Sequence, residues 1–185
     1  MLVGQLAGAA AQESGSFGAG LLVVRVIFGL IMAAHGSQKL LGWFGGHGLA
    51  GTAGFFESIG FRPGKLFAAV ASVSEVAGGL LLAAGLFFPF APALLVSVMI
   101  VAAGSVHWPN GLFAAKNGIE VSLMYGAMAF ALALTGPGQY SLDTLIGLDT
   151  LWTVKEAWVV LGLAMVGGFA NLGLRKATLS TAPAA

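Results

Sequence analysis

Long apolar runs constrain this chain more than any other feature of its sequence. An α-helix needs about 20 apolar residues to cross the hydrocarbon core of a bilayer. The sequence contains five runs close to that length, at residues 18–41, 64–86, 89–107, 119–135 and 153–174. They predict an all-α integral membrane protein, a helical bundle with five spans in a lipid bilayer.

The charge content supports this interpretation and excludes several classes of protein. Charged residues make up 8% of the chain, against about 25% in a soluble domain, so they cannot cover a water-facing surface. The net charge of +1 argues against a nucleic acid partner, which requires a clustered basic surface. The chain contains no cysteine, which excludes disulfides, thiolate metal sites and cysteine nucleophiles.

The hydropathy pattern divides the chain into four parts. We expect an N-terminal tail at residues 1–17, a four-helix membrane domain at 18–146, an extra transmembrane helix at 147–174 and a C-terminal tail at 175–185. Between the first two spans, residues 52–61 contain three phenylalanines and an isoleucine, which favours a short helix in the headgroup zone.

Basic residues gather at one end of the expected bundle. That end collects Lys39, Arg62, Lys65, Lys116, Arg175 and Lys176, whereas the other end carries Lys155, Arg25 and most of the acidic residues. By the positive-inside rule the first end is cytoplasmic. With five crossings, the N-terminus is then outside and the C-terminus in the cytoplasm.

Ionisable side chains inside a span are costly and usually have a partner. Arg25 and Lys39 lie fourteen residues apart, close to four helical turns, and therefore share one face of the first span. Glu75, near the centre of the second span, is the expected partner in this intramembrane charge pairing. If Arg25 pairs with Glu75, a structural role for this ion pair is favoured over a role in chemistry.

A second polar group is expected toward the cytoplasmic end. His35, Lys39, His107 and Glu120 can form one cluster there, with Glu75 at its inner wall. Such a cluster suits the headgroup of an amphipathic ligand, which makes His35, Glu75, His107 and Glu120 the candidates for ligand binding or proton exchange. A purely structural role for the cluster stays open, and no catalytic residue is assigned. No compact metal-binding motif is present, so no metal site is expected, and His47 on its glycine-rich loop is expected to be solvated.

Four motifs in this chain resemble the DoxX family of small bacterial membrane proteins. They are Arg25…Gly29-Leu30…His35-Gly36…Lys39, Glu75…Gly78-Gly79-Leu80-Leu81…Gly85, His107-Trp108-Pro109-Asn110-Gly111…Gly118…Glu120 and Gly136-Pro137-Gly138…Tyr140-Ser141-Leu142-Asp143. The resemblance covers roughly residues 18–146. It implies a four-helix DoxX-like core in the bacterial inner membrane, to which the span at residues 153–174 adds a fifth C-terminal transmembrane helix.

The resemblance also implies a redox role. Relatives include membrane subunits of a thiosulfate:quinone oxidoreductase, so the first hypothesis is a subunit of a redox system that binds quinone and receives electrons from a protein partner or a soluble reductant. His35 or His107 would donate a hydrogen bond to the quinone, and Glu75 or Glu120 would carry protons. A non-catalytic membrane scaffold and a proton-coupled small-molecule transporter are the alternatives, and the sequence leaves open whether the chain is an enzyme.

Overall fold

The computed structural model describes the backbone of residues 2–181 and the side chains of residues 15–179, and this part of the chain contains helices and no strand. In chain order the α-helices are α1 (Leu2–Leu41), α2 (Gly48–Ser58), α3 (Gly64–Ala84), α4 (Phe90–Ala102), α5 (Glu120–Thr135), α6 (Leu142–Leu145) and α7 (Val154–Thr181). A π-helical segment, Ala103–His107, continues α4.

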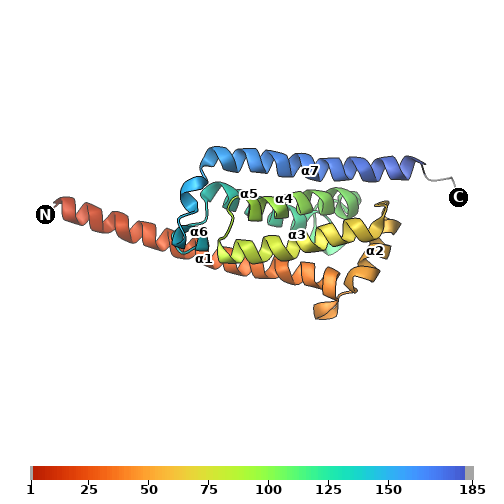
Figure 1. Ribbon diagram of the computed structural model, residues 1–185, viewed down its shortest axis with the longest axis horizontal. Helices are drawn as coiled ribbons and strands as arrows, with labels where there is room; N and C mark the ends of the chain where they lie inside the picture. Colours follow the sequence, from red (N-terminus) through yellow and green to blue (C-terminus); the bar gives the residue numbers. More distant parts are fainter. Residues whose placement is uncertain (1, 182–185) are drawn as a thin grey trace.

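The long helices α1, α3, α4, α5 and α7 run along the long axis of the molecule (Figure 1). The helix α3 packs on both α1 and α4, and α4 in turn contacts α5 and α7. The short helix α2 lies across one end of the bundle, beside the N-terminal end of α3 (Figure 1). At the other end, where α6 lies, α1 extends beyond its neighbours (Figure 1).

The prediction of an all-α membrane bundle is confirmed. Within the described residues, four helical segments are long and apolar enough to cross a membrane: Gly15–Leu41, Gly64–Ala84, Phe90–Asn110 and Val154–Leu179. The remaining predicted span corresponds to α5, which is apolar but has only 16 residues. At 1.5 Å per residue α5 is about 24 Å long, less than the hydrocarbon core of about 30 Å.

The helices also continue beyond the predicted spans. The helix α1 begins at Leu2, and α7 ends at Thr181. Residues 2–17 and 175–181, which the sequence assigns to tails, are therefore helical in the structure. Residue 1 and residues 182–185 of those tails lie outside the described part.

Glycines bring α1 and α3 into backbone contact. A Cβ atom added at Gly79 would lie 2.5 Å from the backbone oxygen of Gly29, and one added at Gly36 would lie 2.7 Å from that of Ser72. A real Cβ cannot be accommodated at such distances, so only glycine permits this approach. Small residues that allow helices to pack closely are typical of membrane bundles, where the hydrophobic effect does not drive helix association.

This contact predicts the effect of one added methyl group. Because a Cβ at Gly29 would collide with the backbone of Gly79, Gly29→Ala should lower the free energy of unfolding by about 1–3 kcal/mol, as overpacking does in other cores. None of the described atoms lies within 4 Å of a Cβ at Gly20 on the same helix, so Gly20→Ala is the matched control. Unfolding of both variants in mixed detergent micelles measures the difference; equal stability would contradict the close contact.

Candidate functional site

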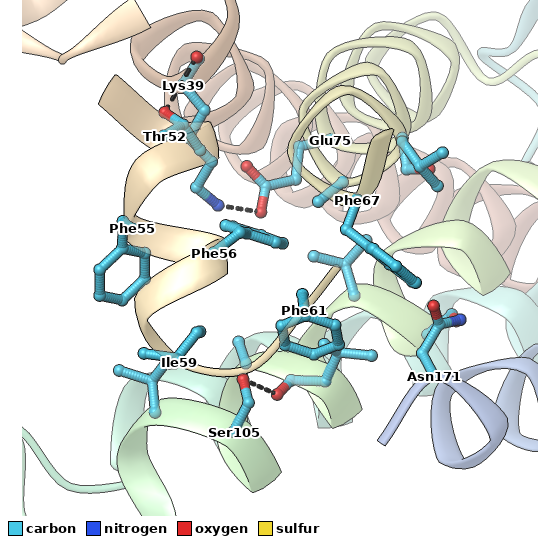
Figure 2. A pocket seen from close by; sticks show the side chains of 18 of the residues that line it. Lys39, Thr52, Phe55, Phe56, Ile59, Phe61, Phe67, Glu75, Ser105 and Asn171 are labelled. Atoms are coloured by element: carbon cyan, nitrogen blue, oxygen red, sulfur yellow. Dashed lines mark hydrogen bonds and ion pairs between the residues drawn. The ribbon is translucent and has the colours of Figure 1, made fainter. Parts of the chain in front are cut away.

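A cavity of about 470 Å³ lies at the end of the bundle that α2 crosses. Its walls come from the end of α1, from α2, α3, α4 with the π-helical segment, and from α7. Most of its lining is apolar, including the phenylalanines Phe55, Phe56, Phe61 and Phe67 (Figure 2). A cavity of this size and character is typical of sites for small amphipathic molecules.

One ion pair belongs to the wall of this cavity. The ammonium of Lys39 on α1 donates to Oε1 of Glu75 on α3 (Figure 2). The side chain of Glu75 is 1% exposed and that of Lys39 is 35% exposed. The second carboxylate oxygen of Glu75, Oε2, is buried and has no hydrogen-bond partner among the described residues.

The register of α1 against α3 explains why these two side chains meet. The helices are antiparallel, and Gly36 faces the turn of α3 between Ser72 and Val76. Lys39 lies one turn further along α1, opposite the region before Glu75. Helical side chains lean toward the N-terminus of their own helix, so Lys39 and Glu75 lean toward each other.

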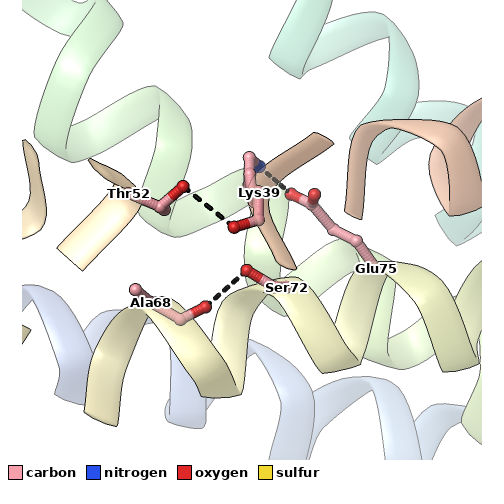
Figure 3. Close-up of polar contacts among 5 residues, drawn as sticks. All are labelled: Lys39, Thr52, Ala68, Ser72 and Glu75. Carbon is pink, nitrogen blue, oxygen red and sulfur yellow. Dashed lines mark hydrogen bonds and ion pairs between the residues drawn. The ribbon is translucent and has the colours of Figure 1, made fainter. Parts of the chain in front are cut away.

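The hydroxyl groups around the ion pair are bonded to backbone oxygens. Thr52 of α2 donates to the carbonyl of Lys39 over 3.1 Å, and Ser72 donates to the carbonyl of Ala68 over 2.6 Å (Figure 3). The first bond fastens α2 to the end of α1. The second bond stays within α3, so the Ser72 hydroxyl does not donate to the Glu75 carboxylate.

Aromatic packing and α7 hold the segment that follows α2 (residues 59–61) in place. Phe61 is buried, and its ring centroid lies 5.5 Å from that of Phe56 and 5.2 Å from that of Phe67. The guanidinium of Arg175 donates to the carbonyl of Ile59 over 2.6 Å. Asn171 of α7 also lines the cavity (Figure 2), so the C-terminal helix is part of the site.

The π-helical segment supplies another wall. Its residue Ser105 is buried and donates to the carbonyl of Val101 over 2.6 Å. His107, at the end of this segment, lines the cavity, and its Nδ1 lies 2.9 Å from the carbonyl oxygen of Asn117. Single π-turns within α-helices often occur at functional sites.

The predicted four-residue cluster does not form. Lys39 and His107 line the cavity, whereas His35 and Glu120 do not. His35 lies on the exposed side of α1, and its ring centroid is 6.2 Å from that of Tyr125 on α5. It precedes Gly36 by one residue, about 100° around the helix, and therefore turns away from the α1–α3 contact.

Glu120 has a local structural role instead. Its Oε2 accepts a hydrogen bond of 2.7 Å from the backbone N–H of Ala114, which holds the loop before α5. His47 is exposed, in agreement with the solvated side chain that the sequence predicts, and it also lines the cavity, which the sequence does not predict. Its place on a glycine-rich loop carries no signal of a cavity, because the return of α2 over the bundle is a long-range contact.

Arg25 is not paired with Glu75, contrary to the expected contact. Its guanidinium is buried at the opposite end of the bundle and donates to the carbonyl oxygens of Pro137 and Tyr140, the latter over 2.8 Å. A Cβ at Gly85 would lie 2.6 Å from this guanidinium. The antiparallel register therefore places Arg25 beside Gly85, ten residues and about 15 Å along α3 from Glu75.

The carboxylate of Asp143 lies close to Arg25, whereas the sequence alone places this residue only at the end of the bundle that carries most of the acidic residues. Asp143 is fully buried and accepts hydrogen bonds from the backbone N–H groups of Phe87 and Phe88, over 2.9 and 2.8 Å. It also acts electrostatically on Arg25. These contacts tie the segment after α5 to the turn between α3 and α4, which indicates a structural role.

Among residues with described side chains, no three histidine, aspartate or glutamate residues lie together in a way that could hold a metal ion. The cavity has hydrogen-bond donors on Lys39, an acceptor on Glu75 and two histidines, His47 and His107, beside a large apolar surface.

A comparison with known protein families decides the relationship of this chain. The family model described as DoxX matches residues 20–108. This match supports membership of the DoxX family. No curated protein and no solved structure gives a significant match. The DoxX match contains Lys39, Glu75 and the π-helical segment, whereas α5, α6 and α7 lie beyond it.

The contacts of Asp143 predict a stability effect. Asp143→Asn removes one of two acceptors for the backbone N–H groups of Phe87 and Phe88, together with the charge near Arg25. We expect the free energy of unfolding to fall by about 2 kcal/mol or more, because hydrogen bonds to buried charged groups are strong.

The control is Asp149→Asn, at a partly exposed residue that accepts a 3.3 Å hydrogen bond from the Thr144 hydroxyl. Its stability should change by no more than about 0.5 kcal/mol. Unfolding in detergent micelles measures both variants, and a neutral Asp143→Asn would contradict the structural role.

Proposed function

We propose that this DoxX protein is a membrane subunit of a redox system and that its cavity binds a quinone. The observation that carries the proposal is the combination of an apolar cavity of about 470 Å³ with an ion pair, Lys39–Glu75, in its wall. A quinone needs an apolar slot for its tail and a donor for a carbonyl oxygen. The phenylalanine-rich lining and the Lys39 ammonium supply these two features.

The side chains of the cavity also suit proton exchange. An ammonium has three N–H donors, and Lys39 is partly exposed and bonded through its side chain to Glu75, so donors remain for a ligand. Reduction of a quinone takes up two electrons and two protons. We propose that Glu75 and His107 carry the protons and that a protein partner or a soluble reductant supplies the electrons, which would make the chain a quinone-linked oxidoreductase subunit.

A scaffold role is the second candidate, and one feature favours it. The helix α1 extends past the rest of the bundle at the end where α6 lies (Figure 1). A projecting helix offers a surface on which a partner helix can dock. In this case the ion pair would serve only to hold α1 against α3.

Filling the cavity tests the quinone proposal. Ala71 and Ala69 are both partly buried alanines on α3, but only Ala71 lines the cavity. Ala71→Phe should weaken binding of a short-tailed ubiquinone to the purified protein in lipid nanodiscs by about tenfold or more, since the added ring occupies the ligand's volume.

Ala69→Phe is the matched control and should bind the quinone as the natural protein does. Equilibrium binding of radiolabelled quinone measures both variants, after thermal unfolding has verified that they are folded. Unchanged binding by a folded Ala71→Phe protein would reject the cavity as the quinone site and leave the scaffold role as the better account.

We also propose that the protein lies in the bacterial inner membrane with the α2 end of the bundle in the cytoplasm. The support is the positive-inside rule, because basic residues of loops and helix ends gather at this end: Arg62, Lys65, Lys116, Arg175 and Lys176. The N-terminus would then be outside and the C-terminus inside.

The absence of natural cysteines makes this orientation easy to test. Ala115→Cys and Thr150→Cys each place a single thiol in an exposed loop, at opposite ends of the bundle. In intact spheroplasts a membrane-impermeant maleimide should label the thiol at position 150, and the thiol at position 115 only after lysis. The reverse pattern would invert the proposed orientation.

A further inference from the structure

One oxygen of the Glu75 carboxylate in the cavity wall, Oε2, lacks a hydrogen-bond donor among the described residues. We infer that the cavity binds the quinol form of its ligand more tightly than the quinone form, and that Glu75 is the residue that determines this preference. The inference rests on the proposed quinone binding. It goes beyond that proposal because it states which redox form the site selects and why.

The carboxylate has unused acceptor capacity. An ionised carboxylate accepts at about four lone-pair sites and donates nothing. In the described structure Glu75 receives one hydrogen bond, from Lys39 to Oε1, while Oε2 is buried without a partner. A buried acceptor that lacks a donor is unfavourable, since it has lost its water without replacement.

Nearby hydroxyl groups do not meet this demand. Each serine or threonine has one O–H donor. Thr52 donates to the carbonyl of Lys39, Ser72 to that of Ala68 and Ser105 to that of Val101. These three donors are engaged with the backbone, and Ser74 and Ser97, which also line the cavity, do not donate to Oε2. A donor brought by the ligand is therefore the natural complement to the carboxylate.

The two redox forms of a quinone differ in this property. A quinone oxygen only accepts, so it can bond to the Lys39 ammonium but would stand against the Glu75 carboxylate as a second acceptor. A quinol hydroxyl has one donor and two lone pairs, so it can donate to Glu75 while accepting from Lys39. The rings and tails of the two forms are nearly the same size, and the apolar lining therefore does not distinguish them.

The size of the expected preference for quinol follows from the hydrogen bond between its hydroxyl and Glu75. Leaving a buried acceptor unpaired, compared with pairing it, corresponds to a factor of roughly ten in affinity. Tighter binding of the reduced form makes the bound couple more oxidising, and a tenfold ratio raises the potential of a two-electron couple by about 30 mV. The site would then favour reduction of a bound quinone by the electron donor.

The test compares the two forms on one protein. The full chain in lipid nanodiscs is titrated without oxygen with decylubiquinone and separately with decylubiquinol. We expect decylubiquinol to bind about tenfold more tightly. In Glu75→Gln the side-chain amide supplies donors of its own to a quinone carbonyl, so the ratio of the two affinities should fall close to one.

Glu120→Gln is the matched control, because Glu120 lies outside the cavity, and it should keep the preference. Equal affinities for the two forms in the natural protein would overturn the inference but not the proposed quinone binding. Failure of both forms to bind would overturn the two together. A preference that persists in Glu75→Gln would overturn the assignment to Glu75.

A second measurement does not depend on a variant that folds. Redox titration of decylubiquinone bound to the natural protein should give a midpoint potential about 30 mV above that of the ligand in protein-free nanodiscs. A potential that is equal or lower would overturn the inference.

Discussion

The backbone contact between α1 and α3 is the constraint on which the rest of the structure depends. Three glycines, Gly29, Gly36 and Gly79, permit it, and the resulting register determines which ionisable side chains meet across the membrane. At one end Lys39 reaches Glu75, and at the other Arg25 lies beside Gly85. A shift of α1 by one turn would move both cations by about 5.4 Å and would break both arrangements.

The two ends of the bundle consequently differ in character. At the α6 end, Arg25 and Asp143 are bonded to backbone groups that hold the turns together, and their chemistry is structural. At the α2 end, an ion pair borders an apolar cavity, and one carboxylate oxygen lacks a partner among the described residues. A polar group that the fold does not satisfy, next to a space that a ligand can occupy, is what separates a binding site from a structural ion pair.

Features that depend on local sequence could be predicted, and those that depend on register could not. Hydropathy identified the helices because each apolar run crosses or nearly crosses the bilayer on its own. It also singled out Lys39, Glu75 and His107. The partner of Arg25 and the outward direction of His35 depend on how α1 meets its neighbours, and periodicity within one helix does not report that. Likewise, Asn171 and Arg175 reach the site only because α7 packs beside α4 and α2, a contact between segments far apart in the chain.

The central claim is that a quinone occupies the cavity beside the Lys39–Glu75 pair, and photo-crosslinking tests it most directly. The protein in nanodiscs would be irradiated with an azido-quinone, digested, and the labelled peptides identified by mass spectrometry. The account predicts labels on the cavity-lining residues of α2, α3 and the π-helical segment, with competition by unlabelled quinone. Labels that fall instead on the outer faces of α1 and α5, around His35 and Tyr125, or that unlabelled quinone does not displace, would contradict it.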